Sequence, residues 1–326
     1  MTAGPRRGSW FPMEYMSAAT GAMGGNIMNA TASAATDMSI IPVCDALGAE
    51  VTGIDVSQPL DEGTIAVINQ ALLDHLVLVF RDQNLSPPAQ IAFTRNWGDI
   101  VRRIATDFLH PEYPDVLVLS NRVVDGKYAG ATQAYAGFTW HQDLTYAACP
   151  SMGSLLHALE VPEEGGDTAF ANMYTGYETL PADTRAQIDK LKALHIRDRR
   201  KNPRAGISDL DGDEFSHDID KYFDIPAPDS VHPVVRTHPE SGRKSLFVSP
   251  RFTVAIEGMD EAEAQPLLDL LFAHQKRSEF IYRHKWCLGD LVFWDNRSTI
   301  HLACGGIKPP GIRHLHRTSI AGDVPY

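Results

Sequence analysis

Two histidines and an aspartate are placed where they could bind one metal ion together. His141 and Asp143 are separated by one residue, and side chains two positions apart in an extended segment point to the same side. His301 follows the apolar run 291–294 and a turn-like segment, so we expect it near the end of a strand. Two imidazoles and one carboxylate are typical of the facial triad that binds non-haem Fe(II) and leaves further coordination positions open.

Other histidines fit a metal site less well. His110 and His238 each stand two residues before a glutamate, but a proline lies between, so we expect surface positions in loops. His157 lies within an apolar run and is expected to be a core residue. His314 and His316 alternate along the last apolar strand, where packing is the expected role.

Two arginines near the end of the chain could bind carboxylates. Arg313 and Arg317 face the same side of an extended segment, and the planar guanidinium can meet both oxygens of a carboxylate. They could therefore bind one dianion or two anions, although an exposed strand face explains the spacing equally well. Gly165 and Gly166 allow a tight turn, after which Thr168 offers a hydroxyl that could assist a carboxylate.

The elements that must position these residues alternate between strand and helix at first and are mostly short strands after residue 115. Apolar periodicity predicts helices at 61–75, 88–97, 182–194 and 260–276. It predicts strands at 50–56, 76–80, 115–119, 151–159, 167–171, 232–237, 244–249, 279–284, 290–294 and 313–320. The polar stretch 200–230 is expected to be an inserted loop. This pattern favours a mainly β fold with flanking helices, either a barrel or a jelly roll.

Composition argues against two classes of partner. The formal net charge of the 326 residues is -12, whereas a nucleic-acid surface needs clustered Lys and Arg. No apolar run reaches the ~18 residues needed to cross a bilayer. We therefore expect neither nucleic acid nor membrane as a partner, and a homo-oligomer stays open. The four cysteines show no C-x-x-C spacing and are expected to be reduced thiols of a cytoplasmic protein.

Residues 1–37 differ from the rest of the chain. They are rich in Ala, Gly, Ser, Thr and Met and have no apolar periodicity. We expect a flexible N-terminal extension before a single domain over residues 38–326. Arg6-Arg7 and 32–34 resemble parts of a twin-arginine export signal, but the segment between them is too weakly apolar, so a cleaved signal is the lesser alternative.

Taken together, these residues resemble the taurine/2,4-dichlorophenoxyacetate dioxygenase family over about residues 40–323. The order and spacing of the blocks make the resemblance specific at the level of the family. The matching blocks are residues 76–81, 83–85, 140–143, 165–168, 241–244, 282–286, 289–297 with His301, and 313–318.

The resemblance implies a double-stranded β-helix, or jelly roll, and an enzyme that uses Fe(II), 2-oxoglutarate and O2. Arg313, helped by Thr168, would bind the distal carboxylate of 2-oxoglutarate. Arg317 would lie beside the 2-oxoglutarate or bind an anionic group of the primary substrate. The implied iron ligands are His141, Asp143 and His301.

The implied reaction is hydroxylation of a small anionic molecule that resembles an aryloxyalkanoate, a sulfonate or a sulfate ester, with succinate and CO2 as co-products. Taurine enzymes carry an Asn four residues before the first iron histidine, and Gly137 stands there in this chain, which argues against taurine. Three alternatives stay open: biosynthetic hydroxylation or desaturation of an amino-acid-derived metabolite, a non-catalytic jelly-roll binding protein, and a zinc hydrolase.

Overall fold

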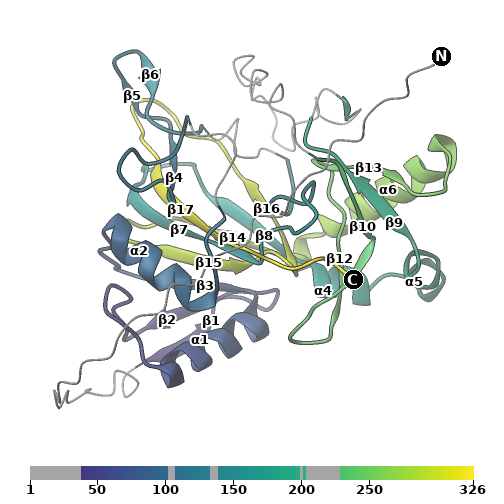
Figure 1. Ribbon diagram of the computed structural model, residues 1–326, viewed down its shortest axis with the longest axis horizontal. Coiled ribbons are helices and arrows are strands. Elements are labelled where there is room, and N and C mark those ends of the chain that lie inside the picture. Colours follow the sequence, from purple (N-terminus) through teal and green to yellow (C-terminus); the bar gives the residue numbers. More distant parts are fainter. Residues whose placement is uncertain (1–37, 102–106, 133–138, 199–200, 203–227) are drawn as a thin grey trace, which may run out of the picture. The chain divides into compact units, whose positions relative to one another are not determined.

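The structure, a computed structural model, describes residues 38–101, 107–132, 139–198, 201–202 and 228–326 (Figure 1). The expected extension 1–37 and most of the expected loop 200–230 lie outside the described residues. Within the described part, no helix is long and apolar enough to cross a membrane. The four cysteines are all free.

A seven-stranded sheet forms the larger part of the fold, with the strand order β1-β2-β3-β15-β7-β17-β4 (Figure 1). Neighbouring strands run antiparallel except β2 and β3, which are parallel. The strands are β1 Ser39–Pro42, β2 Ala49–Thr52, β3 Val77–Phe80, β15 Leu291–Asp295, β7 Gly153–Glu160, β17 His314–Ile320 and β4 Leu117–Ser120.

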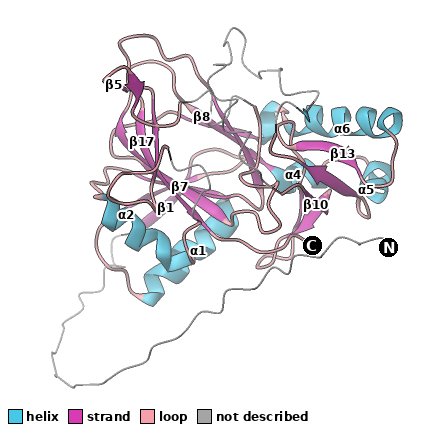
Figure 2. Cartoon of the chain, turned by 45° about the horizontal axis from the view of Figure 1, so that its top comes forward, coloured by secondary structure: helices cyan, strands magenta, loops and turns pink. Residues whose placement is uncertain are grey.

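Helices α1 (Glu62–His75) and α2 (Pro87–Thr94) cover one face of this sheet (Figure 2). Both begin at residues suited to a helix N-terminus. Asp61 accepts a hydrogen bond from the backbone of Thr64, and Ser86 caps α2 just before two prolines. The apolar residues that pack between sheet and helices include Leu78, Phe80, Leu155, Leu291, Phe293 and Ile320 from the sheet, with Ile68, Leu72 and Phe93 from the helices.

A three-stranded sheet packs on the opposite face, in the order β14-β8-β16. Its strands are Ile281–His284, Thr168–Asn172 and Thr299–Ala303. Because side chains alternate along a strand, the large sheet turns a second apolar set toward this small sheet. That set includes Val77, Val79, Leu156, Val292, Trp294 and Leu315, packed against Phe170 and Trp286. The space between the two sheets is where the predicted site residues converge.

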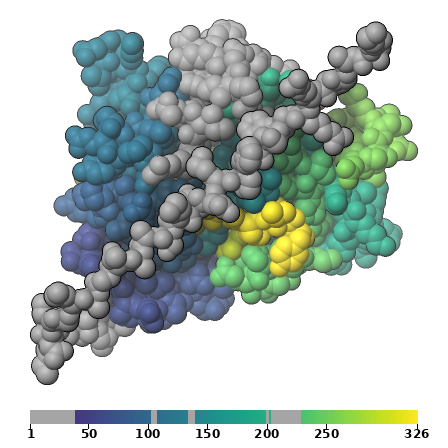
Figure 3. All heavy atoms as spheres, viewed as in Figure 1, coloured from purple at the N-terminus to yellow at the C-terminus, as the bar shows by residue number. Residues whose placement is uncertain are grey.

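The remaining elements form a third group around a separate apolar cluster. The strands β9 (Lys192–His195), β10 (Ser230–Pro233) and β13 (Thr253–Ile256) form one sheet, and β11 (Val235–Thr237) pairs with β12 (Lys244–Leu246). The C-terminal residues lie on the surface beside this group (Figure 3), where Thr237 donates a backbone hydrogen bond to Tyr326 at 2.7 Å. The accompanying helices are α4 Met173–Glu178, α5 Ala182–Ile188 and α6 Glu261–Gln275. A surface hairpin is formed by β5 Val123–Val124 and β6 Lys127–Tyr128.

The mainly β fold with flanking helices is confirmed, and so are the helices near 61–75, 88–97 and 260–276. The helix predicted over 182–194 is wrong in its second half, because α5 ends at Ile188 and β9 begins at Lys192. The single strand predicted over 232–237 is two strands that pair in different sheets. The first error arises because a short apolar run fits helix and strand equally. The second arises because the change of pairing partner after Pro233 is decided by tertiary contacts.

Burial of His195 in β9 generates a prediction about acid stability. Burial and the neighbouring His232 lower the pKa of His195 from 6.5 to about 3. Between about pH 6.5 and pH 3, His195 of the unfolded chain therefore carries a proton that His195 of the folded chain lacks. The contribution of His195 to stability is complete above pH 6.5 and is lost as the pH falls through that window, at up to about 1.4 kcal/mol per pH unit.

His195→Gln removes this titration, so its free energy of unfolding should fall less steeply between pH 7 and pH 5 than that of the wild type. Urea unfolding at several pH values measures the two slopes. Equal slopes would mean that His195 is not the group that takes up the proton on unfolding.

Candidate metal centre and anion site

A short backbone bridge brings the two predicted histidine ligands together. The backbone N–H of His141 donates to the carbonyl of His301 at 3.1 Å, and the N–H of His301 donates back at 2.9 Å. His301 lies in β16, next to β8, whereas His141 lies in a loop outside any sheet. The bridge therefore fixes the loop to the strand, and the two imidazole centroids lie 4.2 Å apart.

The side chains of His141, Asp143 and His301 converge as the sequence predicts. Their ligand atoms all lie within 4.8 Å of one another, and all three residues are buried. Nε2 of each histidine lies 3.8 Å from an oxygen of Asp143, one histidine on each oxygen. Metal–ligand bonds of about 2.1 Å place two donors on one ion roughly 3 to 4 Å apart, so these side chains fit a single metal ion.

The protonation state of His141 suits a metal ligand. Its Nδ1 donates to the carbonyl of Thr139 at 2.8 Å, which leaves the lone pair on Nε2, the nitrogen that faces Asp143. Burial, followed by the charges of His301 and Arg251, holds the pKa of His141 well below its usual value. The ring is therefore neutral at neutral pH, as metal binding requires.

Asn296 holds the backbone of Asp143 from both directions. Its Oδ1 accepts from the Asp143 N–H at 2.7 Å, and its Nδ2 donates to the Asp143 carbonyl at 3.0 Å and to the Ser151 carbonyl at 2.9 Å. Leu144, the next residue, has a φ of 59°, which is uncommon outside glycine. The loop thus makes its sharp turn directly after the carboxylate, and Asn296 fixes the position of that turn.

A buried charge cluster supports the turn that carries Asn296. Asp295 accepts from Arg297 through Nε and Nη2 and lies 3.0 Å from Nε2 of His238. Burial alone would raise the pKa of Asp295, but the charge of Arg297 and the hydrogen bonds from His238 and Arg297 outweigh it and lower this pKa. The predicted surface position of His238 is wrong, because this residue is fully buried. The residues around His238 do not predict this contact, because Asp295 is distant in the sequence.

Arg317 lies against the candidate metal centre. Its Nη2 forms an ion pair with Oδ2 of Asp143 and donates to Oγ of Ser154 at 2.9 Å. Its guanidinium carbon lies 5.3 Å from the ring centroid of Trp294. Since Arg317 and Asp143 are both buried, each charge compensates the other in a site with little water.

Arg313 lies in a second buried cluster. Its Nε donates to the carbonyl of Gly166 at 2.8 Å and its Nη2 donates to Oγ1 of Thr168 at 3.2 Å, while Trp286 donates to the same hydroxyl at 3.1 Å. No carboxylate lies within ion-pair distance of Arg313 among the described residues. Burial lowers its pKa to about 10. A buried cation without an ion-pair partner is costly, so the cluster suits an anionic ligand.

The two glycines that precede this cluster are required by close packing. Gly166 has a φ of 77°, and a Cβ there would lie 3.1 Å from Cδ of Arg313. A Cβ on Gly165 would lie 2.3 Å from the carbonyl oxygen of Gly306. The glycines therefore let this turn approach both Arg313 and the segment after β16.

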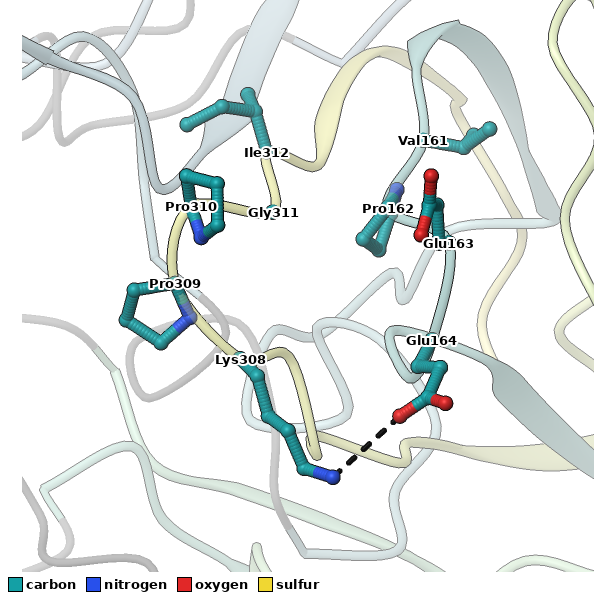
Figure 4. A pocket seen from close by; sticks show the side chains of 9 residues that line it. All are labelled: Val161, Pro162, Glu163, Glu164, Lys308, Pro309, Pro310, Gly311 and Ile312. Carbon is teal, nitrogen blue, oxygen red and sulfur yellow. Dashed lines mark hydrogen bonds and ion pairs between the residues drawn. The ribbon is translucent and has the colours of Figure 1, made fainter.

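A surface pocket of about 400 Å³ lies between segments 161–164 and 308–312 (Figure 4). Lys308 and Glu164 point toward one another from the two segments, and their charged atoms lie 3.4 Å apart. Neither Arg313 nor Thr168 lines this pocket. It is therefore distinct from the buried anion site, although the same two segments continue into both.

Sequence reasoning placed the five residues His141, Asp143, His301, Arg313 and Thr168 in two clusters that the structure also forms. Arg317 is adjacent to the first cluster. Sequence reasoning did not assign Ser154 or Trp286 to the site, because each joins it through a contact with a residue distant in the chain. His157 is a core residue as predicted, with Nε2 at 2.9 Å from the carbonyl of Gln83.

Comparisons with known proteins agree with this geometry. A family model described as taurine catabolism dioxygenase TauD, TfdA family, matches residues 39–319. The chain is 35% identical over 277 residues to an alpha-ketoglutarate-dependent 2,4-dichlorophenoxyacetate dioxygenase of Cupriavidus pinatubonensis, over 81% of this chain and 92% of that protein. It is 33% identical over 315 residues to an alpha-ketoglutarate-dependent sulfate ester dioxygenase of Pseudomonas putida, over 92% and 95%. A solved taurine dioxygenase from Burkholderia xenovorans is 32% identical, with a TM-score of 0.73 over 88% of this chain and 90% of that one.

The Asn296 contacts generate a prediction about metal binding. Asn296→Ala removes both hydrogen bonds to the Asp143 backbone, so the carboxylate should lose its fixed position. We expect the affinity for Mn(II) to fall by about 10- to 100-fold, the range typical when a residue that orients a metal ligand is lost. Calorimetric titration with Mn(II) measures the change. Asn69→Ala is the matched control, because Asn69 donates to Glu240 on the surface; equal Mn(II) affinity of the two variants would contradict the role of Asn296.

Proposed function

The chain belongs to the TauD/TfdA family of dioxygenases, and on this premise we propose that it hydroxylates a small anionic organic molecule and releases succinate and CO2. The enzyme is a 2-oxoglutarate-dependent dioxygenase that requires Fe(II) and O2. The observation that carries the proposal is the convergence of His141, Asp143 and His301 within 4.8 Å in a buried site. Fe(II) bound there would activate O2, and the decarboxylation of 2-oxoglutarate would drive that activation.

The three side chains have distinct tasks in this proposal. His141 and His301 offer neutral imidazole nitrogens, and Asp143 offers the one negative charge of the ligand set. Thr139 fixes the ring orientation of His141 through Nδ1, and Asn296 fixes the backbone of Asp143. Arg317 holds the Asp143 carboxylate by an ion pair and stands where it can also meet an anion bound beside the metal.

The cluster around Arg313 is proposed to bind the distal carboxylate of 2-oxoglutarate. Nε and one Nη2 hydrogen of Arg313 are used by Gly166 and Thr168, and the remaining N–H groups are donors for a carboxylate. Thr168 accepts hydrogen bonds from both Arg313 and Trp286, so its own hydroxyl hydrogen can be donated to the same carboxylate. Binding would then supply the negative charge that this buried cation requires.

We also propose that the two facing sheets form the double-stranded β-helix expected from the sequence, in one catalytic domain over residues 38–326. The support is that the seven-stranded and three-stranded sheets pack face to face, with β16 carrying His301 and β17 carrying Arg317 toward the space between them. Residues 1–37 are proposed to be an extension that the reaction does not need.

The proposed substrate class comes from the relatives, whose names specify 2,4-dichlorophenoxyacetate and sulfate esters. Each of these molecules joins an anionic group to an apolar body through an oxygen atom. Hydroxylation of the carbon beside that oxygen gives a hemiacetal-like product, which breaks its C–O bond without further catalysis. We propose the same outcome for an aryloxyalkanoate-like or sulfate-ester-like substrate here.

The test of the triad is turnover. His141→Ala, Asp143→Ala and His301→Ala should each abolish substrate-stimulated release of succinate, because each removes a donor from the metal site, while circular dichroism should show a retained fold. Near-normal hydroxylation by Asp143→Ala would refute the assignment. His157→Ala is a useful comparison, since His157 is a buried histidine away from the ligand atoms.

The test of the anion site is binding of 2-oxoglutarate. Arg313→Ala should weaken its binding to the Mn(II)-loaded protein by about 30-fold or more, because truncating one partner of a buried charge pair costs roughly 2–5 kcal/mol. Arg313→Lys should restore only part of the affinity, since an ammonium lacks the planar fork. Arg283→Ala is the control, because Arg283 is exposed and pairs with Asp167. A similar loss in the control would place the effect outside the Arg313 cluster.

A further inference from the structure

Trp286 follows strand β14 and reaches back to a hydroxyl of the Arg313 cluster. His284, the last residue of β14, is the register partner of Thr168 in β8. Trp286 lies two residues later, outside any strand, and is buried in the apolar layer between the two facing sheets. Its indole Nε1 donates to Oγ1 of Thr168 at 3.1 Å. The Trp286 side chain therefore connects the segment after β14 to the first residue of β8.

The Trp286 ring is held by two neighbouring side chains. The imidazole of His284 packs perpendicular to it, with ring centroids 4.7 Å apart. His284 is itself fixed, because its Nε2 lies 3.0 Å from Oδ2 of Asp290 and its Nδ1 lies 2.9 Å from the hydroxyl of Tyr282. The guanidinium carbon of Arg313 lies 5.5 Å from the Trp286 ring centroid. The direction of the indole N–H is therefore set by side chains that have fixed positions of their own.

The hydrogen bonds at Thr168 determine where its hydroxyl hydrogen can point. A threonine hydroxyl has one hydrogen and two lone pairs. Both lone pairs have donors, since Trp286 donates at 3.1 Å and Nη2 of Arg313 donates at 3.2 Å. Neither donor can accept a hydrogen bond, so the hydroxyl hydrogen must point in a third direction. Without the indole N–H, Arg313 alone would constrain the hydroxyl, and its hydrogen could turn toward the vacated position.

Packing alone does not account for the hydrogen bond of Trp286. In the described part of the chain, Nε1 of Trp97 and Nε1 of Trp294 are both buried without a hydrogen-bond partner. This protein thus accommodates tryptophan rings in its core whose N–H groups bind nothing. The indole of Trp286 differs because its N–H meets a hydroxyl that the proposed anion site uses.

We propose that Trp286 is a positioning residue for 2-oxoglutarate. Its N–H orients the Thr168 hydroxyl so that the hydroxyl hydrogen is donated to the distal carboxylate. This inference rests on the proposed function and deepens it, because it requires that the Arg313 cluster bind that carboxylate. Trp286 acts through Thr168, and the stacking of Arg313 on its ring is a separate contact that a phenylalanine ring can keep.

A double-mutant cycle tests whether Trp286 acts through Thr168. Trp286→Phe removes the N–H and keeps an aromatic ring, whereas Thr168→Val removes the hydroxyl at nearly constant volume. Calorimetry measures binding of 2-oxoglutarate to the Mn(II)-loaded wild type, both single variants and the double variant. Trp286→Phe should weaken binding about 3- to 10-fold, the range expected for one hydrogen bond. The double variant should bind within about twofold of Thr168→Val alone, because the hydroxyl through which Trp286 acts is already absent.

Trp97→Phe is the matched control for the loss of an indole. Trp97 packs against Phe93 and Phe293 in the apolar layer below α1 and α2, away from Thr168. Its replacement should leave the affinity for 2-oxoglutarate unchanged. A loss equal to that of Trp286→Phe would show a general effect of core packing and would overturn the inference.

Ligand selectivity gives a second readout that a merely structural role would not change. 2-Oxopentanoate has the 2-oxo acid group and the chain length of 2-oxoglutarate but no distal carboxylate. Its affinity for the Mn(II)-loaded protein should therefore be the same in the wild type and in Trp286→Phe. An equal weakening of both ligands would assign Trp286 a packing role and overturn the inference.

The remaining outcomes separate the inference from the function on which it rests. Losses from Trp286→Phe and Thr168→Val that multiply in the double variant would show that Trp286 acts independently of the hydroxyl, and the inference alone would fail. Wild-type affinity in Trp286→Phe beside weakened binding in Thr168→Val would have the same meaning. If Thr168→Val and Arg313→Ala both bind 2-oxoglutarate as tightly as the wild type, the proposed anion site is wrong and the inference fails with it.

Discussion

The pair of backbone hydrogen bonds between His141 and His301 is the constraint on which the site depends. It joins a loop to β16, the strand that pairs with β8 at the edge of the small sheet, and it sets the separation of the two imidazoles. Asp143 follows two residues later, so its position is determined once the bridge forms and Asn296 holds the next peptide. The surrounding sheets therefore need only to keep β16 and the turn before it in place, which the buried Asp295–Arg297–His238 cluster does.

The site is also organised around buried positive charge. Arg317 is balanced within the protein by Asp143. Arg313 donates to the neutral Gly166 carbonyl and Thr168 hydroxyl and stacks on Trp286, and no ion-pair partner of Arg313 is found in the described part of the chain. In the function that we propose, the first arrangement orients a metal ligand and the second binds an anion with a buried cation. The folded chain therefore carries a free-energy cost at Arg313 that ligand binding can relieve, and such a site selects for a carboxylate over a neutral group.

The sequence predicted those parts of the site whose side-chain direction follows from a local rule. The alternation in a strand places Arg313 and Arg317 on one side, and the spacing of His141 and Asp143 lets them share an ion. It did not predict that His238 is buried, since the contact with Asp295 joins distant parts of the chain.

Strand β17 is a shared component of two layers, because one set of its residues faces the small sheet and the other faces α2. Leu315 and Arg317 belong to the first set, and Thr318 contacts Thr94 of α2 at 2.7 Å. Inserting one residue into this strand would turn histidines toward the small sheet and arginine toward the helix. A length change within β17 would therefore alter both layers at once, whereas a change in the connection before the strand leaves the alternation of β17 unchanged.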